Sequence, residues 1–488
     1  MNKLKVIFIL TGLLFLIFLL LQQRKPAKEE IQTEEPPAII KEEPDRTAER
    51  IRVVLKDYSE NDIHHQEVTL IPDTSYEVIR DSQSVLHEAG EPVTVCYTAG
   101  DSQYSLFLIP SKETARTAIP SLQRSQGTPL YRGMFELQCT ENGIVIINDL
   151  PLEEYLYAVV PSEMPSDYPF EALKAQAICA RTYAVKQMQY SKYTDLGADV
   201  DDSTSYQVYN NTCESDAVNR AVDATRGKVA TYDGKVKDTY YFSTSCGYTT
   251  DGGSWKEDSK EDMSYLTSRK LSEEAIEAWA VQGETDNITE EDFEAFIRSA
   301  DAADYESKEP WYRWTMQIEG AALGRIDEKI KERYQVNPDK ILTQNEKGIY
   351  QSVKPPEIGE LQDIQVAMRG DGGVIESLII VGSHATIQIL TEYNVRYVMS
   401  TEGASIRRQD GSDTACGMLL PSAFFTMDIE YQDDRLESMM LYGGGYGHGT
   451  GMSQNCARSM ALKGMTAENI IRSFYQELEI GDLSADML

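Results

Sequence analysis

One stretch of this chain, residues 169–189, has the composition of a single long helix. It begins with proline, is rich in alanine and contains no glycine, and Asp167 just before it is suited to cap a helix. The sequence on both sides has a different period, because short β-rich runs broken by Gly, Asp and Pro fill residues 51–150 and resume near residue 361. Strands around one strong helix predict an α+β fold with a β-rich body.

Two other regions complete the predicted organisation. Residues 228–242 have the pattern of a hairpin, with Asp233 and Gly234 at the turn. Residues 268–358 contain acidic amphipathic segments, capped at Ser272 and Thr289, and predict a helical insertion that interrupts the body. We therefore expect five parts: an N-terminal transmembrane anchor (1–22), a disordered Pro/Glu-rich tether (23–50), a β-rich N-terminal region (51–150), a core with an active-site helix and a Gly-rich loop (151–267 plus 359–488), and the insertion (268–358).

The N-terminal segment is apolar from residue 6 to residue 21 and is preceded by Lys3 and Lys5. Its length is at the short end for a membrane-spanning helix and also suits the core of a signal peptide. Because polar and basic residues follow it in place of a small-residue cleavage site, we expect an uncleaved anchor, with a cleaved signal as the alternative. The Pro/Glu-rich residues after it have little apolar surface to bury, which predicts an extended tether.

Charge and cysteine content exclude several classes of protein. The 488 residues include 46 Lys and Arg against 79 Asp and Glu, a net charge of −33, and such a surface repels nucleic acid. The seven cysteines contain no CxxC pair, so neither a zinc ribbon nor a thioredoxin-type site is supported. Disulfides and buried free thiols both remain open.

The first candidate site is the segment PSEMPSDYPFEALKAQAICARTYAV, residues 161–185. Glu163 lies in an expected loop bracketed by Pro161 and Pro165, which would hold its carboxylate on a stiff turn. Apolar neighbours would raise the pKa of this carboxyl group and suit it to general acid catalysis. The alternative is a solvated loop glutamate, which is common in acidic chains.

The helix that follows presents Gln176, Cys179 and Tyr183 on one face, at i, i+3 and i+7. Gln176 and Tyr183 are suited to hydrogen-bond across a cleft, whereas Cys179 is expected to pack in the core. Arg181 lies off that face, and a structural ion pair and a substrate contact are equally open for it.

The second candidate is the Gly-rich segment GGGYGHGTGMSQNCARSMALKGM, residues 443–465. Glycine tolerates positive φ and lets a ligand approach the backbone. His448, one of only five histidines, is the best base or hydrogen-bond donor in the chain. Tyr446, Ser453 and Gln454 are interleaved with the glycines, which favours a functional loop over a flexible linker, and no GK[ST] follows to make a phosphate-binding loop.

A third segment, YYFSTSCGYTTDGGSW at residues 240–255, carries clustered hydroxyl groups. Ser243 and Thr244 are candidates to line a carbohydrate or peptide groove, and DDSTSYQVY at residues 201–209 is similar in character. The alternative is that these hydroxyls bond their own backbone at strand ends.

Together these segments resemble the stage II sporulation protein D / LytB amidase-enhancer family. The resemblance rests on PLEEYLYAVVPSEMPSDYPFEALKAQAICARTYAV, DDSTSYQVY, YYFSTSCGYTTDGGSW and GGGYGHGTGMSQNCARSMA, which occur in the family's order. It implies an extracytoplasmic protein that cleaves peptidoglycan glycan strands as a lytic transglycosylase in sporulation or wall remodelling. The alternatives are a non-catalytic glycan-binding enhancer of a cell-wall amidase and a wall-tethered scaffold. No cofactor is expected, and no histidine lies close to Cys246 to complete the zinc site of some family members.

The resemblance also assigns roles to residues. The family's catalytic glutamate lies in the SEMP motif, which makes Glu163 the expected catalytic acid. A lytic transglycosylase needs one such group, which protonates the glycosidic oxygen and then accepts the proton of the sugar's own C6 hydroxyl, whereas a hydrolase also needs a second carboxylate. Glycan contacts are expected from Gln176, Arg181, Tyr183, Ser243, Thr244, Tyr446, His448, Ser453 and Gln454.

The anchor prediction can be tested in spheroplasts. If the N-terminal segment holds the protein at the membrane with its bulk outside, added protease should degrade everything beyond the tether. Immunoblotting with an antibody against the C-terminal part would follow the degradation, and a cytoplasmic marker would report lysis. Full protection until the cells are lysed would instead place the folded part in the cytoplasm.

Overall fold

The structure is a computed structural model that describes residues 50–57, 62–100, 103–255, 262–274, 289–299, 303–433 and 435–487. These residues all belong to one compact unit, which runs from residue 46 to residue 488. The predicted anchor and almost all of the tether lie outside the described residues, as does most of the helix expected after Ser272. Within the described ranges, no helix has the length and apolar character needed to cross a membrane.

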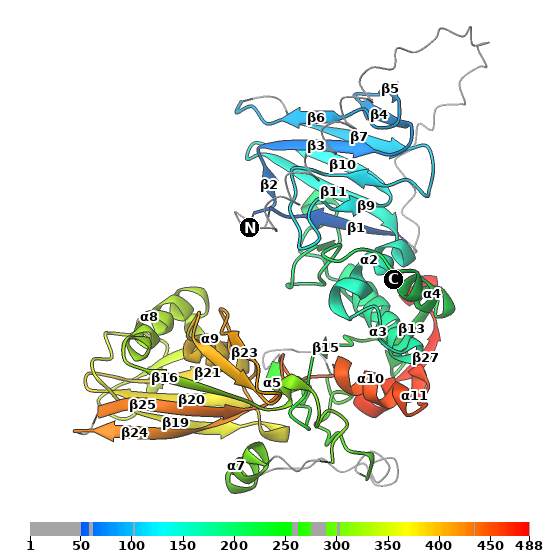
Figure 1. Cartoon of the computed structure of the whole chain (residues 1–488). Coiled ribbons are helices and arrows are strands. Elements are labelled where there is room, and N and C mark those ends of the chain that lie inside the picture. The colour runs from blue at the N-terminus through cyan, green and yellow to red at the C-terminus, as the bar shows by residue number, and fades with distance from the viewer. Residues whose placement is uncertain are drawn as a thin grey trace, which may run out of the picture. The chain divides into compact units, whose positions relative to one another are not determined.

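The N-terminal region is β-rich, as its sequence predicts (Figure 1). The strand order of its main sheet is β12-β1-β11-β10-β7-β4-β5, with β2 also on β11, and a smaller sheet has the order β6-β3-β8-β9. The continuous apolar run of β11 explains its central place, since all but one of its residues are buried. The strands are β1 (Arg50–Leu55), β2 (His64–His65), β3 (Glu67–Pro72), β4 (Tyr76–Arg80), β5 (Gln83–His87), β6 (Val93–Cys96), β7 (Tyr104–Pro110), β8 (Thr117–Ala118), β9 (Leu130–Tyr131), β10 (Met134–Cys139), β11 (Ile144–Pro151) and β12 (Val200–Asp201).

The alanine-rich segment forms helix α3 (Phe170–Met188), which is buried on two sides. One side packs with the N-terminal strands, α2 (Leu152–Glu163) and α4 (Asp216–Ala224), and the other packs with α10 (Gln454–Leu462) and α11 (Ala467–Phe474). Figure 1 shows the two C-terminal helices, in red and orange, beside α3. Small side chains let helices approach from both sides, which explains why this helix is alanine-rich and lacks a polar face.

The hairpin predicted over residues 228–242 is confirmed only in its first part. Strands β13 (Lys228–Tyr232) and β14 (Lys235–Val236) pair antiparallel around the Asp233-Gly234 turn. β13 also pairs with the C-terminal strand β27 (Glu479–Asp482). The end of the predicted hairpin becomes a separate strand, β15 (Tyr241–Phe242), which pairs parallel with β26 (Met452–Ser453).

Residues between these two strands build a second hydrophobic cluster around two further sheets. The sheet orders are β23-β22-β16-β25-β24 and β18-β17-β21-β20-β19. The strands are β16 (Trp314–Glu319), β17 (Ile341–Gln344), β18 (Tyr350–Gln351), β19 (Leu361–Arg369), β20 (Ile375–Gly382), β21 (Thr386–Leu390), β22 (Ser405–Arg408), β23 (Asp413–Ala415), β24 (Phe425–Gln432) and β25 (Arg435–Gly443). The helices are α5 (Gly252–Trp255), α7 (Glu290–Arg298), α8 (Ala321–Val336) and α9 (Glu392–Met399); short 3-10 turns are η1 (Thr194–Leu196), η2 (Pro310–Tyr312), η3 (Pro338–Lys340), η4 (Asp371–Gly373) and η5 (Ala485–Met487).

The segment expected to be a helical insertion, residues 268–358, contributes β16, β17 and β18 to these sheets. Helix α7 is capped by Thr289 as predicted, and α8 matches a predicted amphipathic run. However, β16 is the middle strand of its sheet, pairing with β22 on one side and β25 on the other. The α+β class is therefore confirmed, while the separation of this segment from the β-rich body is not what the structure shows.

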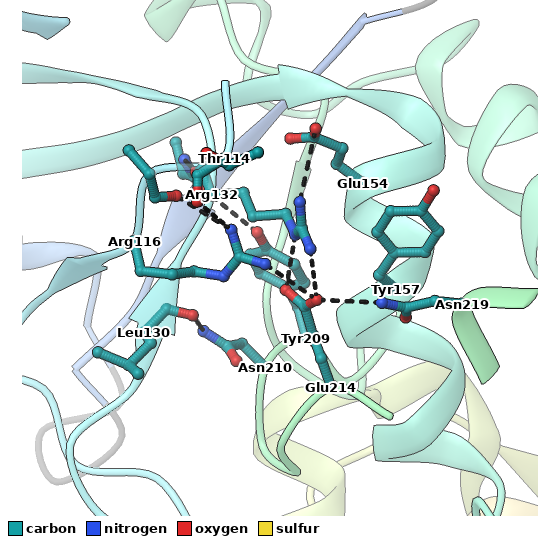
Figure 2. A network of polar contacts seen from close by, with 12 residues as sticks. Thr114, Arg116, Leu130, Arg132, Glu154, Tyr157, Tyr209, Asn210, Glu214 and Asn219 are labelled. Atoms are coloured by element: carbon teal, nitrogen blue, oxygen red, sulfur yellow. Dashed lines mark hydrogen bonds and ion pairs between the residues drawn. The ribbon is translucent and has the colours of Figure 1, made fainter. Parts of the chain in front are cut away.

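Charged side chains join the N-terminal region to α2 and to the segment just before α4 (Figure 2). Arg132 donates from Nε and Nη2 to the two carboxylate oxygens of Glu214, both at 2.8 Å, and its Nη1 lies 3.7 Å from Glu154. Arg116 adds a bond to Glu214 at 3.3 Å. Burial opposes ionisation of Glu214, but the bonds and charges of both arginines outweigh it and lower the pKa of Glu214. Glu214 is thus an ionised anchor for two loops.

Replacing Arg132 should reveal how much this network stabilises the fold. Arg132→Ala leaves two partly buried carboxylates without their main partner, so we expect the free energy of unfolding to fall by about 2–4 kcal/mol at pH 7. Because a lowered carboxyl pKa contributes stability above the unfolded value and loses it as the pH falls, the difference should shrink below about pH 4. Urea unfolding at both pH values measures it. Arg407→Ala, in an exposed pair with Asp413, is the control and should cost less than about 1 kcal/mol.

Candidate functional site

The candidate segments meet at the pairing of β15 with β26. The parallel pair of β15 and β26 sets Phe242 beside Ser453. Just beyond, Thr244 and Tyr446 exchange two backbone hydrogen bonds, with N···O distances of 3.1 and 2.7 Å. The Ser/Thr-rich segment and the Gly-rich loop, separated by about two hundred residues in sequence, therefore lie side by side.

The glycines of the loop serve this close contact between two backbone segments. Gly447 and Gly451 have φ values of 124° and 78°, which L side chains rarely adopt. A Cβ atom added at Gly451 would lie 2.1 Å from the carbonyl oxygen of Tyr240, and one at Gly447 would lie 2.6 Å from Cβ of Phe242. The sequence predicts that the glycines admit a ligand to the backbone, but at these two positions they admit residues 240–242.

Glu163 is the last residue of helix α2, which continues through Pro161. The prediction of a loop over residues 161–165 is therefore wrong at its start, because a proline late in a helix loses only one backbone bond and is tolerated here. The Glu163 side chain is half-buried, and its Oε1 accepts a hydrogen bond from the backbone N–H of Val208 at 2.8 Å. This bond brings the segment 201–209 to the carboxyl group.

Three tyrosines interact electrostatically with the Glu163 carboxyl group. Burial, outweighing the Val208 bond, raises the pKa of Glu163 to about 7. Burial and then the charge of Glu163 raise the pKa values of Tyr155 and Tyr241, and Glu163 also contributes to the raised pKa of Tyr183. Gln207 contacts one of these tyrosines, since its amide donates to the Tyr241 hydroxyl at 2.9 Å. A carboxyl group with this pKa exchanges protons readily near neutral pH.

His448 has a structural role that its sequence position does not reveal. Its Nδ1 accepts the backbone N–H of Thr450 at 3.1 Å, which leaves Nε2 to donate to the carbonyl oxygen of Tyr241 at 3.0 Å. Burial, aided by the charge of Arg396, lowers the pKa of His448 to about 3. The neutral ring thus holds the Gly-rich loop to β15, and both of its nitrogens are already engaged with backbone groups.

Several predicted binding residues are buried and do not reach the surface. Nε2 of Gln454 lies 3.4 Å from Oε1 of Gln176, which links the start of α10 to α3. Ser243, in contrast, is half-buried, and its hydroxyl lies 3.1 Å from that of Thr244. The buried members of the predicted set are Gln176, Arg181, Thr244, Ser453 and Gln454; those that reach the surface are Glu163, Tyr183, Ser243, Tyr446 and His448.

Arg181 is a structural residue, and its assignment as a substrate contact is wrong. It is completely buried and forms a two-point ion pair with Glu153, at 2.9 Å from Nε and 2.6 Å from Nη2. Its guanidinium also donates to the carbonyl oxygens of Val222 and Lys228. With its donors used inside the protein, it ties α3 to α2 and to the chain after α4.

Two residues that the sequence analysis did not predict, Trp311 and Asn455, contact predicted site residues. The Tyr446 ring is 44% exposed and packs against Trp311, with ring centroids 4.7 Å apart. Asn455 is half-buried, donates to the Thr244 hydroxyl at 2.9 Å and accepts a short hydrogen bond from the Tyr168 hydroxyl. Aromatic faces beside amide and hydroxyl groups are suited to bind a polar ring.

The segment around Trp311 braces both loops of the site. The carbonyl oxygen of Trp311 accepts the N–H of Gly445 at 2.8 Å, and the Trp314 indole donates to the carbonyl of the same glycine at 3.2 Å. Arg313 donates to the carbonyl of Cys246 at 2.8 Å. The aromatic cluster PWYRW, with two of the chain's four tryptophans inside an acidic region, was the available sequence signal for this role.

A buried carboxyl group from the same region, Glu306, also reaches both loops. It is fully buried and accepts hydrogen bonds from Ser453 Oγ at 2.6 Å and from the N–H of Ser245 at 3.0 Å. Burial, opposed by these bonds, raises the pKa of Glu306 to about 8. No local pattern in the sequence distinguishes this glutamate from its acidic neighbours.

The cysteines do not add a second chemistry to the site. All seven lie in described residues and are free thiols, and Cys246 and Cys456 are buried. Burial raises the pKa of the Cys246 thiol to about 12, so it is not a nucleophile there. Among the residues described by the structure, no group of three or more His, Cys, Asp or Glu side chains is arranged to hold a metal ion.

Comparison with known proteins identifies a family domain in this chain. The family model for "Stage II sporulation protein" (SpoIID) matches residues 140–232, which include Glu163, α3 and the 201–209 segment. The chain carries a SpoIID domain. The resemblance seen in the sequence motifs is thereby confirmed. A second family model, a domain of unknown function (DUF8618), matches residues 254–451 and spans the expected insertion together with the strands that follow it.

Relatives of the SpoIID domain differ in how much of each protein is matched. Stage II sporulation protein D of Bacillus subtilis is 25% identical over 77% of this chain and 88% of its own length. The amidase enhancer of B. subtilis is 23% identical over 66% of this chain, and an uncharacterized protein of Brachyspira hyodysenteriae is 47% identical over 22% of it. The chain spans only 39% and 29% of the length of these last two proteins.

The raised pKa of Glu163 has a consequence for stability that can be measured. The folded state binds a proton at this group more tightly than the unfolded state, so the wild-type protein loses stability as the pH rises from about 4.5 through 7. Glu163→Gln removes this loss, and its advantage over wild type should grow by about 3 kcal/mol between pH 4.5 and pH 8. Urea unfolding at several pH values measures the difference. A constant difference would show that Glu163 titrates at an ordinary value.

Proposed function

We propose that this chain cleaves the glycan strands of peptidoglycan by a lytic transglycosylase-like mechanism, with Glu163 as the catalytic acid. The observation that carries the proposal is the state of this carboxyl group in the SpoIID domain: half-buried, bonded to one backbone N–H, and with a pKa of about 7. At neutral pH roughly half of the molecules hold the proton, so the same group can donate it and accept it back.

The proposed reaction uses that single group twice. Glu163 donates its proton to the glycosidic oxygen, the bond from that oxygen to the sugar C1 breaks, and positive charge develops on the ring. The Glu163 carboxylate then accepts the proton of the C6 hydroxyl of the same sugar, whose oxygen bonds to C1 and closes an anhydro ring. No water enters the products, and no second carboxylate is required.

Substrate placement is proposed to fall to the groups that reach the surface. Tyr183, Ser243 and Asn455 supply hydroxyl and amide groups of the kind that bond sugar hydroxyls or acetamido groups. The exposed ring of Tyr446, supported by Trp311, is suited to pack against the C–H face of a sugar ring. The buried members of the predicted set would support these groups from behind.

A second candidate function is that of a non-catalytic enhancer of a cell-wall amidase. It is favoured by the likeness to the protein named amidase enhancer, which extends over 66% of this chain. In either case we propose that the protein acts outside the cytoplasm, held at the membrane by its N-terminal segment, in sporulation or wall remodelling. The likeness to stage II sporulation protein D supports the sporulation setting.

Glu163→Gln separates the catalytic proposal from its alternative. The substitution keeps the shape and the hydrogen bond to Val208 but removes the proton, so cleavage of purified, peptide-free glycan strands should fall by about 10²–10⁴-fold with binding largely retained. Product analysis for anhydro ends measures cleavage, and sedimentation with insoluble glycan measures binding. Glu437→Gln, at an exposed position on β25, is the matched control.

The outcomes distinguish the two functions. Near-full cleavage by Glu163→Gln would exclude this residue as the acid. If the wild-type protein releases no anhydro products but accelerates a purified wall amidase, and Glu163→Gln does so equally, the enhancer function holds and the lytic mechanism fails.

A further inference from the structure

Glu306 lies at the junction of the two loops that carry the candidate site. Its Oε1 accepts from Ser453 Oγ at 2.6 Å and from the N–H of Ser245 at 3.0 Å, and its Oε2 makes a short hydrogen bond with Ser245 Oγ. The side chain is 0% exposed, so these contacts are made without competition from solvent. Buried polar groups with several good partners hold those partners in one arrangement.

Each serine also satisfies a backbone group of its own loop. Ser245 Oγ accepts the N–H of Gly247 at 3.1 Å, and Ser453 Oγ caps α10 by accepting the N–H of Cys456 at 3.4 Å. A hydroxyl group has one proton and two lone pairs, so its bond to Glu306 sets which way the lone pairs point. The carboxyl group thus orients the turn at 245–247 and the first turn of α10 together.

These two turns hold the surface groups of the site. Ser243 precedes the Ser245 turn, and its carbonyl oxygen accepts the N–H of Asn455 at 3.0 Å. Asn455 belongs to the first turn of α10 and bonds the Thr244 hydroxyl at 2.9 Å. A shift of either turn would therefore move Ser243 and Asn455 apart.

We propose that Glu306 is a positioning residue of the glycan site: its buried carboxyl group locks the 243–247 and 453–456 segments so that Ser243 and Asn455 face the substrate together. The inference rests on the proposed glycan-binding function but assigns a new role to the chain between residues 254 and 451. Glu306 lies outside the SpoIID match and inside the match to the domain of unknown function. That second domain thus supplies part of the site's support.

The test uses the full chain in the Glu163→Gln background, so that binding is measured without turnover. Glu306→Ala should weaken binding of peptide-free glycan strands about tenfold and speed amide exchange in both 243–247 and 453–456, because both turns lose their shared acceptor. Glu306→Gln should restore both readouts. The amide oxygen replaces Oε1, and the amide nitrogen donates to Ser245 Oγ, as the protonated acid does.

A second variant tests each turn separately and covers the case in which Glu306→Ala fails to fold. Ser453→Ala removes one donor, so exchange should speed in 453–456 and stay slow in 243–247. Glu437→Gln, at an exposed position on β25, is the control and should change neither segment.

The outcomes separate this inference from the proposed function. Unchanged exchange and binding in Glu306→Ala, or Glu306→Gln no better than Glu306→Ala, would overturn the positioning role. If the parent protein binds no glycan, the proposed function fails, while the exchange pattern still decides whether Glu306 locks the two turns.

Discussion

The structure depends on one close contact between backbone segments, where residues 240–247 lie against residues 444–453. The parallel pairing of β15 and β26 starts this contact, and glycines make it possible, since a Cβ at Gly451 would lie 2.1 Å from a carbonyl oxygen. His448 then joins the segments through Nε2, which bonds the carbonyl oxygen of Tyr241, while its Nδ1 accepts the N–H of Thr450 within its own loop. Loss of this contact between residues 240–247 and 444–453 would separate the hydroxyl-rich segment from the Gly-rich loop.

Burial divides the functional segments into two layers. Glu163, Tyr183, Ser243 and Tyr446 reach solvent, whereas Gln176, Thr244, Ser453 and Gln454 do not. Buried polar groups lose water and must find partners inside the protein. Gln454 finds one in Oε1 of Gln176, on an element distant in sequence, whereas Nε2 of Gln176 is buried without a hydrogen-bond partner among the described residues. A sequence motif can therefore include side chains that are buried inside the protein.

The sequence predicts local features well and long-range ones poorly. The α3 helix, the strand segments and the Asp233-Gly234 turn follow from composition and period, and the order of the motifs identifies the family. Three predictions failed for physical reasons. Pro161 was expected to begin a loop but lies inside α2, Arg181 was expected to contact substrate but pairs with Glu153, and β16 was missed because its partners lie about ninety and one hundred and twenty residues away. Glu306 was missed because burial, which makes it important, has no signature in an acidic sequence.

Helix α3 packs between two groups of elements, and this determines the order in which its two sides can be covered during synthesis. One side of the helix can be covered by segments that precede it or follow it closely, but its other side is covered by α10 and α11, near the C-terminus. Strand β13 likewise has β14 on one side, but its other edge is paired only by β27. A nascent chain must therefore keep this apolar surface of α3 exposed until α10 and α11 have left the ribosome. Long-range closure of this kind is slow, and it makes the unfinished chain a natural client for chaperones.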